Sequence, residues 1–374
     1  MLKPLKKLNA WLHLWLGLAS GIVVVILGIT GCILVFEQEI KSLSSPWLHV
    51  EKSAKGTYLP PSALYKEVKK ALPQKEISSV WYHGAAHTAH FSINDSDSMI
   101  YVNPYTAEIV AMVDHEDFFH EIDEGHRHLW LPPNIGRPIV GWATFVFFLL
   151  TITGLILWWP KNLKKSNVDK SFKVKWKAKF KRVNYDLHNV FGFYSMILAL
   201  LMAITGLIMS FSWFNQSVYW LTGGDTNQPQ PKEEIFKPSK MPMLEQVDKV
   251  WLKVQDEIAV DNKDQIIVSF PDHEDDPIYV CTDMVNGHWR DLYFKQADLS
   301  LTSTTKERTA DLPFADKVRK LNYSLHVGAF AGLASKIIYF IASLICASLP
   351  ITGFYIWWGK KKKSKKKSSK PALG

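Results

Sequence analysis

Four long apolar runs dominate the pattern of hydrophobic and polar positions along the chain. The first, residues 14–36, extends over 23 residues without a charged side chain. At about 1.5 Å per residue, a helix of that length crosses a hydrocarbon layer of about 30 Å. The other runs occupy residues 139–159, 189–211 and 337–358. The pattern therefore predicts four transmembrane helices.

These runs repeat one another. Residues 12–31 begin with Leu-His, continue with a glycine four residues after the histidine and end in Thr-Gly, and residues 187–206 carry the same groups at the same spacing. The second and fourth runs both end in Ile-Thr-Gly, three further residues and Trp-Trp. Each half of the chain thus holds two spans, which predicts an internal duplication whose halves enter the membrane in the same direction.

The segments between the spans combine one stretch of helical spacing with several stretches of alternating polar and apolar residues. The first segment predicts a helix at 62–72 and strands at 77–82, 88–93, 99–102 and 108–113. The second predicts a helix at 241–255 and strands at 265–270, 277–282 and 289–294. The expected fold class is a membrane protein: four transmembrane α-helices as a duplicated, parallel-repeat bundle, with two small α+β domains outside the membrane.

Charge fixes the expected orientation. Residues 1–10, 160–187 and 359–374 carry 21 of the 44 basic and two of the 35 acidic side chains, so these segments hold +19 and the remainder −10. Basic segments beside spans face the cytoplasm, which predicts an inner-membrane protein with both termini inside and two periplasmic domains. The overall +9 therefore reflects topology and contact with membrane lipid, not binding of nucleic acid.

These features divide the chain into eight parts. They are a basic leader with the first span (1–36), a first outer domain (37–136), the second span (137–159), a basic loop (160–187), the third span (188–214), a second outer domain (215–328) with a flexible connector (215–240), the fourth span (329–358) and a Lys-rich tail (359–374).

A family resemblance follows from three stretches. Residues 101–108 resemble the strand–turn–strand of a PepSY domain, and residues 126–129 and 325–328 are similar to the segments that lead into the second and fourth spans of PepSY-associated transmembrane proteins. The resemblance extends over nearly the whole chain. It implies PepSY-like outer domains and a haem-bearing, iron-related inner-membrane reductase of the ferric-siderophore type.

Histidines in apolar spans point independently to metal chemistry, because a polar side chain there is costly without a partner. Imidazole is a common axial ligand of haem iron. We expect two b-type haems, since no Cys-x-x-Cys-His attachment motif is present. The inner haem would be held by His13 and His188, and the outer one by His326 with either His126 or His128. The resemblance favours His126, whereas the spacing to the following Thr-Gly favours His128.

Glycines and basic residues complete the predicted sites. Gly17 and Gly192 would leave room for a flat porphyrin near the inner face, and Gly31 and Gly206 near the outer face. Close helix packing is the alternative role for the Thr-Gly pairs. The propionates of an outer haem would be neutralised by Arg137 and Lys336, and those of an inner haem by Arg182. We expect no catalytic residue distinct from the haems.

The predicted activity is transfer of electrons across the membrane to a periplasmic ferric siderophore or other ferric chelate, with release of Fe(II). A separate donor is required, a quinol or a cytoplasmic reductase, because no Gly-x-Gly-x-x-Gly follows a strand. One alternative is a non-enzymatic envelope binding or sensing protein without haem, and a transporter is another. His83, His87 and His90 are expected to face water, with a metal site as the alternative.

Overall fold

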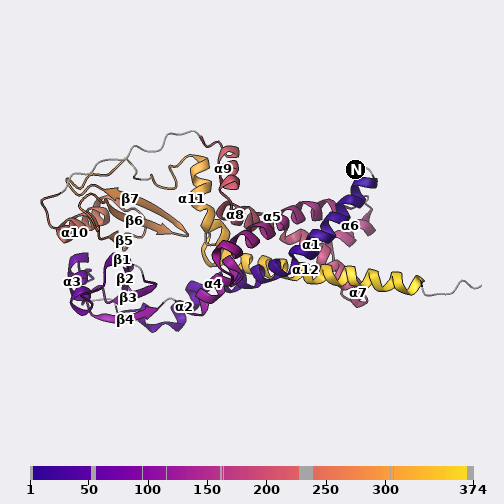
Figure 1. Cartoon of the computed structure of the whole chain (residues 1–374), viewed down its shortest axis with the longest axis horizontal. Helices are drawn as coiled ribbons and strands as arrows, with labels where there is room; N and C mark the ends of the chain where they lie inside the picture. Colours follow the sequence, from indigo (N-terminus) through magenta and orange to yellow (C-terminus); the bar gives the residue numbers. More distant parts are fainter. Residues whose placement is uncertain are drawn as a thin grey trace, which may run out of the picture. The chain divides into compact units, whose positions relative to one another are not determined.

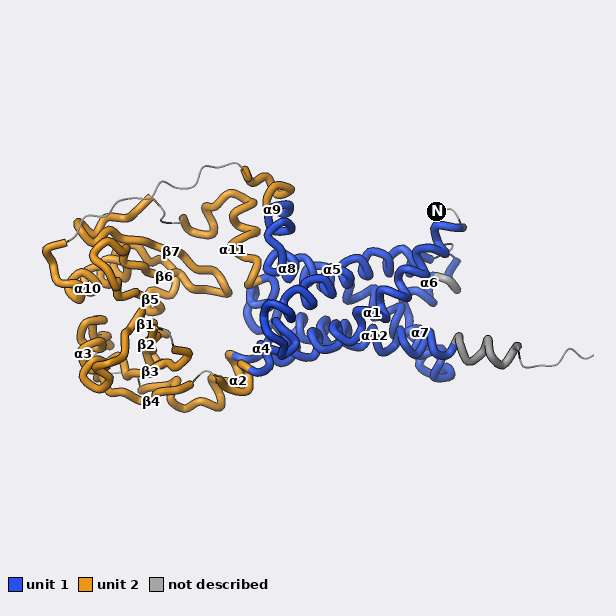
Figure 2. The backbone as a smooth tube through the Cα atoms, in the orientation of Figure 1, with its two compact units in different colours: residues 1–37, 121–218, 325–374 blue, residues 38–120, 219–324 orange. Residues whose placement is uncertain are grey.

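The computed structural model describes residues 3–51, 56–94, 96–114, 116–160, 162, 164–226, 239–303, 305 and 307–368. The chain forms two compact units (Figure 2). A helical unit contains residues 1–37, 121–218 and 325–374, and a sheet unit contains residues 38–120 and 219–324. Much of the predicted connector, residues 227–238, and the end of the tail, residues 369–374, lie outside the described residues.

Four apolar helices form the helical unit (Figure 1). They are long and apolar enough to cross a membrane over Pro4–Leu34, Pro133–Trp158, Phe180–Ser210 and Gly332–Gly359. They correspond to α1 (Lys3–Leu34), α5 (Pro133–Trp158), α7 (Phe180–Asp186) continued by α8 (Gly192–Ser210), and α12 (Gly332–Ser368). The four spans predicted from the apolar runs are therefore present as helices.

The helices pack in a ring in which α1 and α8 each contact α5 and α12. Small residues bring α1 and α12 especially close. A Cβ added to Gly28 would lie 2.8 Å from the Cβ of Ala347, and the Ser343 hydroxyl donates to the Gly28 carbonyl at 3.1 Å. Close approach at small residues is a common way for membrane helices to associate.

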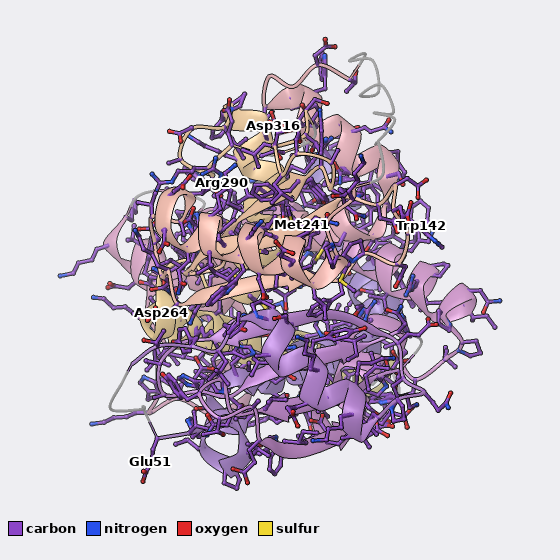
Figure 3. The ribbon with its side chains drawn as sticks, turned by 90° about the vertical axis from the view of Figure 1, so that its left-hand side faces the viewer. Glu51, Trp142, Met241, Asp264, Arg290 and Asp316 are labelled. Carbon is purple, nitrogen blue, oxygen red and sulfur yellow. The ribbon has the colours of Figure 1, made fainter. Side chains whose placement is uncertain are left out.

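One seven-stranded antiparallel sheet organises the sheet unit, in the order β4-β3-β2-β1-β5-β6-β7. Helices α3 (Pro61–Ala71) and α10 (Met243–Lys253) contact each other, and their apolar faces, including Leu64 and Val250, share one buried core with the strands. Figure 3 shows both helices in front of the strands. The strands are β1 (Ile77–His83), β2 (Ala89–Ile93), β3 (Ser98–Val102), β4 (Ile109–Asp114), β5 (Gln265–Ser269), β6 (Ile278–Val285) and β7 (His288–Phe294).

The outer segments fold into the predicted helices and strands, but they share one sheet instead of forming two. Strand β1 of the first segment pairs with β5 of the second over five residue pairs, from Ser79–Ser269 to His83–Gln265. An unpaired edge would expose backbone donors and acceptors of both strands. Pairing β1 with β5 satisfies these groups, and alternation within each segment could not reveal that the two edges match.

Short helices join these parts. They are α2 (Glu37–Ser44), α4 (Phe118–His128), α6 (Lys165–Phe172), α9 (Ser212–Leu221) and α11 (Phe314–Val327).

Candidate functional site

Two pairs of histidines face each other within the helical unit. At the end of the bundle where α1 begins, here called the basic end, the ring centres of His13 and His188 are 6.4 Å apart. At the end where α1 finishes, here called the far end, those of His126 and His326 are 6.2 Å apart. Both pairs join one ring from the first half of the chain to one from the second.

Each of the four rings is hydrogen-bonded through Nδ1 to a threonine on another helix. These threonines are the central residues of the four Ile-Thr-Gly sequences. The Nδ1–Oγ1 distances are 2.9 Å for His13–Thr153, 2.9 Å for His188–Thr352, 2.8 Å for His126–Thr30 and 2.9 Å for His326–Thr205.

The threonines also determine where the imidazole proton resides. Every one of these hydroxyls donates to a carbonyl four residues earlier in its own helix, as Thr153 does to Leu149 at 2.9 Å. The hydroxyl oxygen must therefore accept its second bond from Nδ1–H of the histidine. This tautomer leaves the lone pair on Nε2, the nitrogen that can then bind a metal.

The glycine after each threonine leaves room for the ring. A Cβ on Gly154 or Gly353 would lie 3.2 Å from Cε1 of His13 or His188, respectively. At the far end, a Cβ on Gly31 would lie 3.4 Å from Cε1 of His126, and one on Gly206 would lie 3.3 Å from Cε1 of His326. The space that Gly31 and Gly206 leave is thus taken by imidazole.

A cavity of about 430 Å³ opens beside the basic-end pair and is lined by both of its histidines. Gly17 and Gly192 also line it, and a Cβ on Gly17 would meet nothing closer than Leu150 at 3.8 Å. Its volume falls within the range of about 300–1,000 Å³ typical of cofactor and ligand sites. The helix around His188 takes a π-helical turn over Leu187–Phe191, a distortion that is frequent at functional sites.

The separation of the rings suits a single metal ion between them. Two imidazoles on opposite sides of one ion place their ring centres about 6 Å apart, since each metal–nitrogen bond is about 2 Å and each nitrogen lies about 1.1 Å from its ring centre. Among the described residues, no group of three or more His, Cys, Asp or Glu side chains could hold a metal ion.

Comparison with known families agrees with this architecture. The model of the PepSY-associated TM region matches residues 10–360. The chain belongs to the PepSY-associated transmembrane family. With its four apolar helices, this PepSY-associated protein is a membrane protein. No curated protein sequence matches it.

The far-end pair distinguishes the two histidines that the sequence left as alternatives. His126 lies opposite His326, whereas the ring nitrogens of His128 are both engaged: Nδ1 with Glu124 at 3.0 Å and Nε2 with Arg137 at 2.9 Å. Burial lowers the pKa of His126, and burial together with the neighbouring His126 lowers the pKa of His326 to about 4. Both shifts favour the neutral ring, the form of histidine that can bind a metal.

The arginines predicted to neutralise haem propionates contact side chains of the protein itself. Arg137 donates to His128, and Arg182 pairs with the buried carboxylate of Asp186 at 2.7 Å. Lys336 is buried near the start of α12, with 8% of its surface exposed. These contacts account for Arg137 and Arg182 without a propionate.

Two asparagines that sequence reasoning missed also support the basic-end pair. Asn9 donates to the Thr153 carbonyl at 3.1 Å, and Asn184 donates to the Thr352 carbonyl at 3.0 Å. Each lies four residues before its histidine, so the recurrence of Asn-x-x-Leu-His could have identified them.

Two of the three sheet-unit histidines that were expected to face water, His83 and His90, do not, whereas His87 is partly exposed. His90 is buried, and its Nδ1 lies 2.7 Å from Nε2 of His83. Their ring centres are 4.9 Å apart, and the ring of His83 stacks on Trp81 at 4.4 Å. With His87 included, they form no group that could hold a metal ion among the described side chains.

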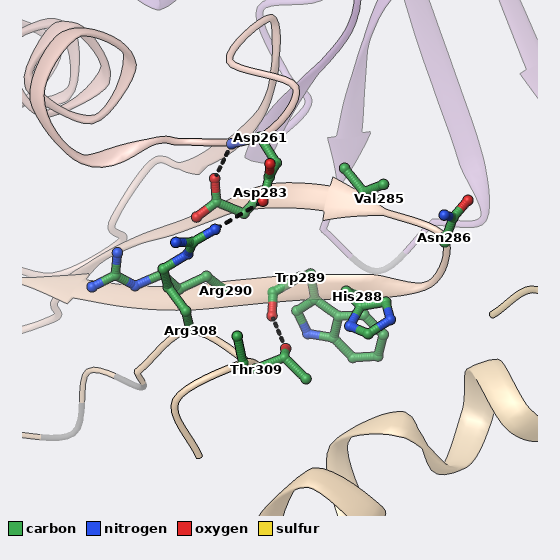
Figure 4. A pocket seen from close by; sticks show the side chains of 10 residues that line it. Asp261, Asp283, Val285, Asn286, His288, Trp289, Arg290, Arg308 and Thr309 are labelled. Atoms are coloured by element: carbon green, nitrogen blue, oxygen red, sulfur yellow. Dashed lines mark hydrogen bonds and ion pairs between the residues drawn. The ribbon is translucent and has the colours of Figure 1, made fainter. Parts of the chain in front are cut away.

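A second concavity, of about 240 Å³, lies in the sheet unit and contains none of the predicted site residues. Figure 4 shows its charged wall, where Arg308 pairs with Asp261 at 2.9 Å and Asp283 accepts the Asp261 amide at 2.8 Å. Asp283 has φ of 56° and is buried. The charged groups of this wall thus contact one another.

Proposed function

We propose that this protein is a di-haem b oxidoreductase of the bacterial inner membrane that reduces a periplasmic ferric chelate, such as a ferric siderophore, and thereby releases Fe(II). One observation carries the proposal: two histidine pairs at opposite ends of one bundle have the same ring separation, and every ring has its Nδ1 on a threonine. Ordinary packing gives no reason for four equal arrangements.

The histidine pairs would hold the two haems, His13 with His188 and His126 with His326. When bound, haem supplies one-electron redox chemistry. The chain supplies the rest. The threonines keep Nε2 unprotonated and fix the plane of each ring, because a hydrogen bond to the second imidazole nitrogen orients a ligand histidine. Gly17 and Gly192 add no side chain to the cavity wall, and most of the side chains that line the cavity are apolar.

The proposed orientation follows from charge. Residues 1–10, 160–187 and 359–374 hold +19 and the rest of the chain −10, so the basic end, where α1 begins, would lie in the cytoplasm and the sheet unit in the periplasm. The two histidine pairs lie at levels 17 residues apart along α1, from His13 to the Thr30 that holds His126. That is about 25 Å of helix, close to the thickness of the hydrocarbon layer.

The net reaction takes one electron from a separate donor, a quinol or a cytoplasmic reductase, and converts one Fe(III) in the chelate to Fe(II). Hard oxygen ligands hold Fe(II) less tightly than Fe(III), so reduction would release the iron. The duplication inferred from the sequence would explain why each half contributes one histidine to each pair.

An absorption spectrum of detergent-purified protein tests the proposal. We expect a Soret band with two haems per chain, and a shift on reduction by dithionite. His13→Ala with His188→Ala should lower the ratio to one, because both proposed ligands of one haem are lost. A control with His273→Ala and His288→Ala, both in the sheet unit, should keep two haems. A colourless wild-type protein would refute the proposal and favour a binding or sensing role for the sheet unit.

A further inference from the structure

A strongly basic segment at residues 173–181 lies outside the sites described so far. It contains five lysines and no acidic residue, and lysines alternate with apolar residues along it. All five lysine side chains are exposed. Between them, Trp176 is 67% exposed and Phe180 is 70% exposed. Exposed apolar side chains rimmed by polar residues mark a contact site for a protein or a membrane.

Most of this charge has no counter-charge within the described structure. Lys173 pairs with Asp169 at 3.0 Å, and Lys181 donates to the Gly359 carbonyl at 3.1 Å. Lys175, Lys177 and Lys179 make no ion pair or side-chain hydrogen bond to any described residue. A cluster of this kind attracts an acidic partner over about a Debye length, roughly 8 Å at physiological salt.

The segment is anchored to the wall of the basic-end cavity. Trp158, which lines that cavity, donates from Nε1 to the Ser171 carbonyl at 2.9 Å, just before the segment. Its ring stacks on Phe193, another lining residue, with centres 3.7 Å apart. On the other side, the Lys175 amide donates to buried Asp186 at 3.2 Å. The lysines are therefore held beside the cavity that His13 and His188 share.

We propose that residues 173–181 are the docking surface for the electron donor, and that the donor is a small acidic one-electron carrier protein with a flavin or iron–sulfur centre. This inference rests on the proposed function. The reduced carrier loses one electron for each Fe(III) reduced, so the balance requires no other reactant. Electron-transfer partners typically meet over less than about 1,200 Å² and depend on complementary charge, and an exposed Trp176 supplies an aromatic contact at the centre.

Binding of a purified bacterial flavodoxin, as the acidic probe, to full-length protein in nanodiscs of zwitterionic lipid tests the inference without reference to turnover. We expect saturable binding at low salt. The affinity should fall about tenfold or more when the salt concentration is raised to a physiological level, where the Debye length is roughly 8 Å. Lys175→Glu with Lys177→Glu and Lys179→Glu should weaken binding by about tenfold or more. The control Lys66→Glu, Lys240→Glu, Lys263→Glu makes the same charge change at exposed positions of the sheet unit and should leave binding within about twofold.

Each contrary result is distinct. Absent binding in the wild type, or equal weakening by both triple variants, overturns the docking surface. If Lys175→Glu with Lys177→Glu and Lys179→Glu weakens association with anionic lipid in nanodiscs but leaves flavodoxin binding unchanged, the segment is a lipid contact. That result also overturns the docking surface. The haem content of every sample is measured alongside. Colourless protein that binds flavodoxin would refute only the proposed function, and haem-loaded protein that does not bind it would refute only the docking surface.

Discussion

Histidines gather in both units of the molecule, and the two arrangements differ in one respect. In the sheet unit, His83 and His90 bond directly to each other, 2.7 Å from nitrogen to nitrogen. In the helical unit, the rings of each pair are more than 6 Å apart at their centres, and every Nδ1 bonds to a threonine instead. The first arrangement leaves no room for an ion, whereas the second leaves two nitrogens available across a gap. Partners and separation, not the number of histidines, distinguish a packed cluster from a ligand set.

Removing the far-end rings should give the largest effect. His126→Ala with His326→Ala is expected to lower the haem content from two to one per chain, because both residues that would hold one haem are lost. His128→Ala should keep two, since Glu124 and Arg137 engage its nitrogens. Haem extracted per mole of protein measures both. Loss of one haem in His128→Ala would show that His128 is a ligand, and that engaged ring nitrogens do not mark a histidine that cannot bind haem.

Acid should instead affect the sheet unit. Burial, with smaller contributions from His90 and His87, lowers the pKa of His83 well below its ordinary value. The unfolded chain therefore binds the proton more readily, and the free energy of unfolding decreases as the pH falls below about 6.5, by at most about 1.4 kcal/mol per pH unit for one histidine.

Hydrogen exchange of β1 and β2 between pH 8 and pH 5 measures this loss of stability. His83→Phe keeps an aromatic ring against Trp81 and should flatten the dependence, while His273→Phe, at an exposed position, should not. A wild-type protein whose β1 and β2 are equally protected at both pH values would contradict the prediction.

Threonine substitutions should give the smallest effect, a shift in the midpoint potential of one haem. They test whether the histidine–threonine bonds, which the sheet unit's histidine cluster lacks, serve the ligands. Thr153→Val removes the acceptor of the His13 Nδ1–H, whereas Thr352→Val leaves the His188 Nδ1–H the Leu349 carbonyl at 3.1 Å. In the double variant one bond is therefore lost outright, which makes the His13 imidazole a weaker electron donor. We expect the midpoint potential of that haem to rise by about 20–60 mV, the equivalent of one lost hydrogen bond. Thr144→Val is the control, because the Thr144 hydroxyl donates to the Val140 carbonyl at 2.8 Å and to no histidine among the described residues. An unchanged potential in a fully loaded double variant would show that the threonines serve packing alone.

Much of this architecture is accessible from the sequence because it depends on periodicity. Uncharged runs long enough to cross a membrane predicted the spans, and a histidine directly before two of these runs predicted the basic-end pair of His13 and His188. The role of the threonines was not accessible, because Thr153 and His13 are 140 positions apart and only packing of α1 on α5 brings them together. The same holds for His126 and His128: two positions apart on one helix, they face different neighbours.

The shared sheet illustrates the same limit. Alternation located β1 and β5 but could not indicate that their edges match, since pairing across 182 positions, as between His83 and Gln265, leaves no local mark. The prediction that His83 and His90 face water was wrong for a related reason: the alternation of β2 does not show that its polar positions are covered by a neighbouring ring.

Pairing of β1 with β5 also constrains how the chain can be divided. If the chain were cut between its two halves, each fragment would expose a newly unpaired strand edge, that of β1 or of β5. Each fragment would also keep only one histidine of each facing pair. Neither fragment could hold an ion between two rings, and each would tend to aggregate through its bare edge. Reassembly of the fragments would repair both defects at once, so cofactor uptake should report directly on whether the two halves have found each other.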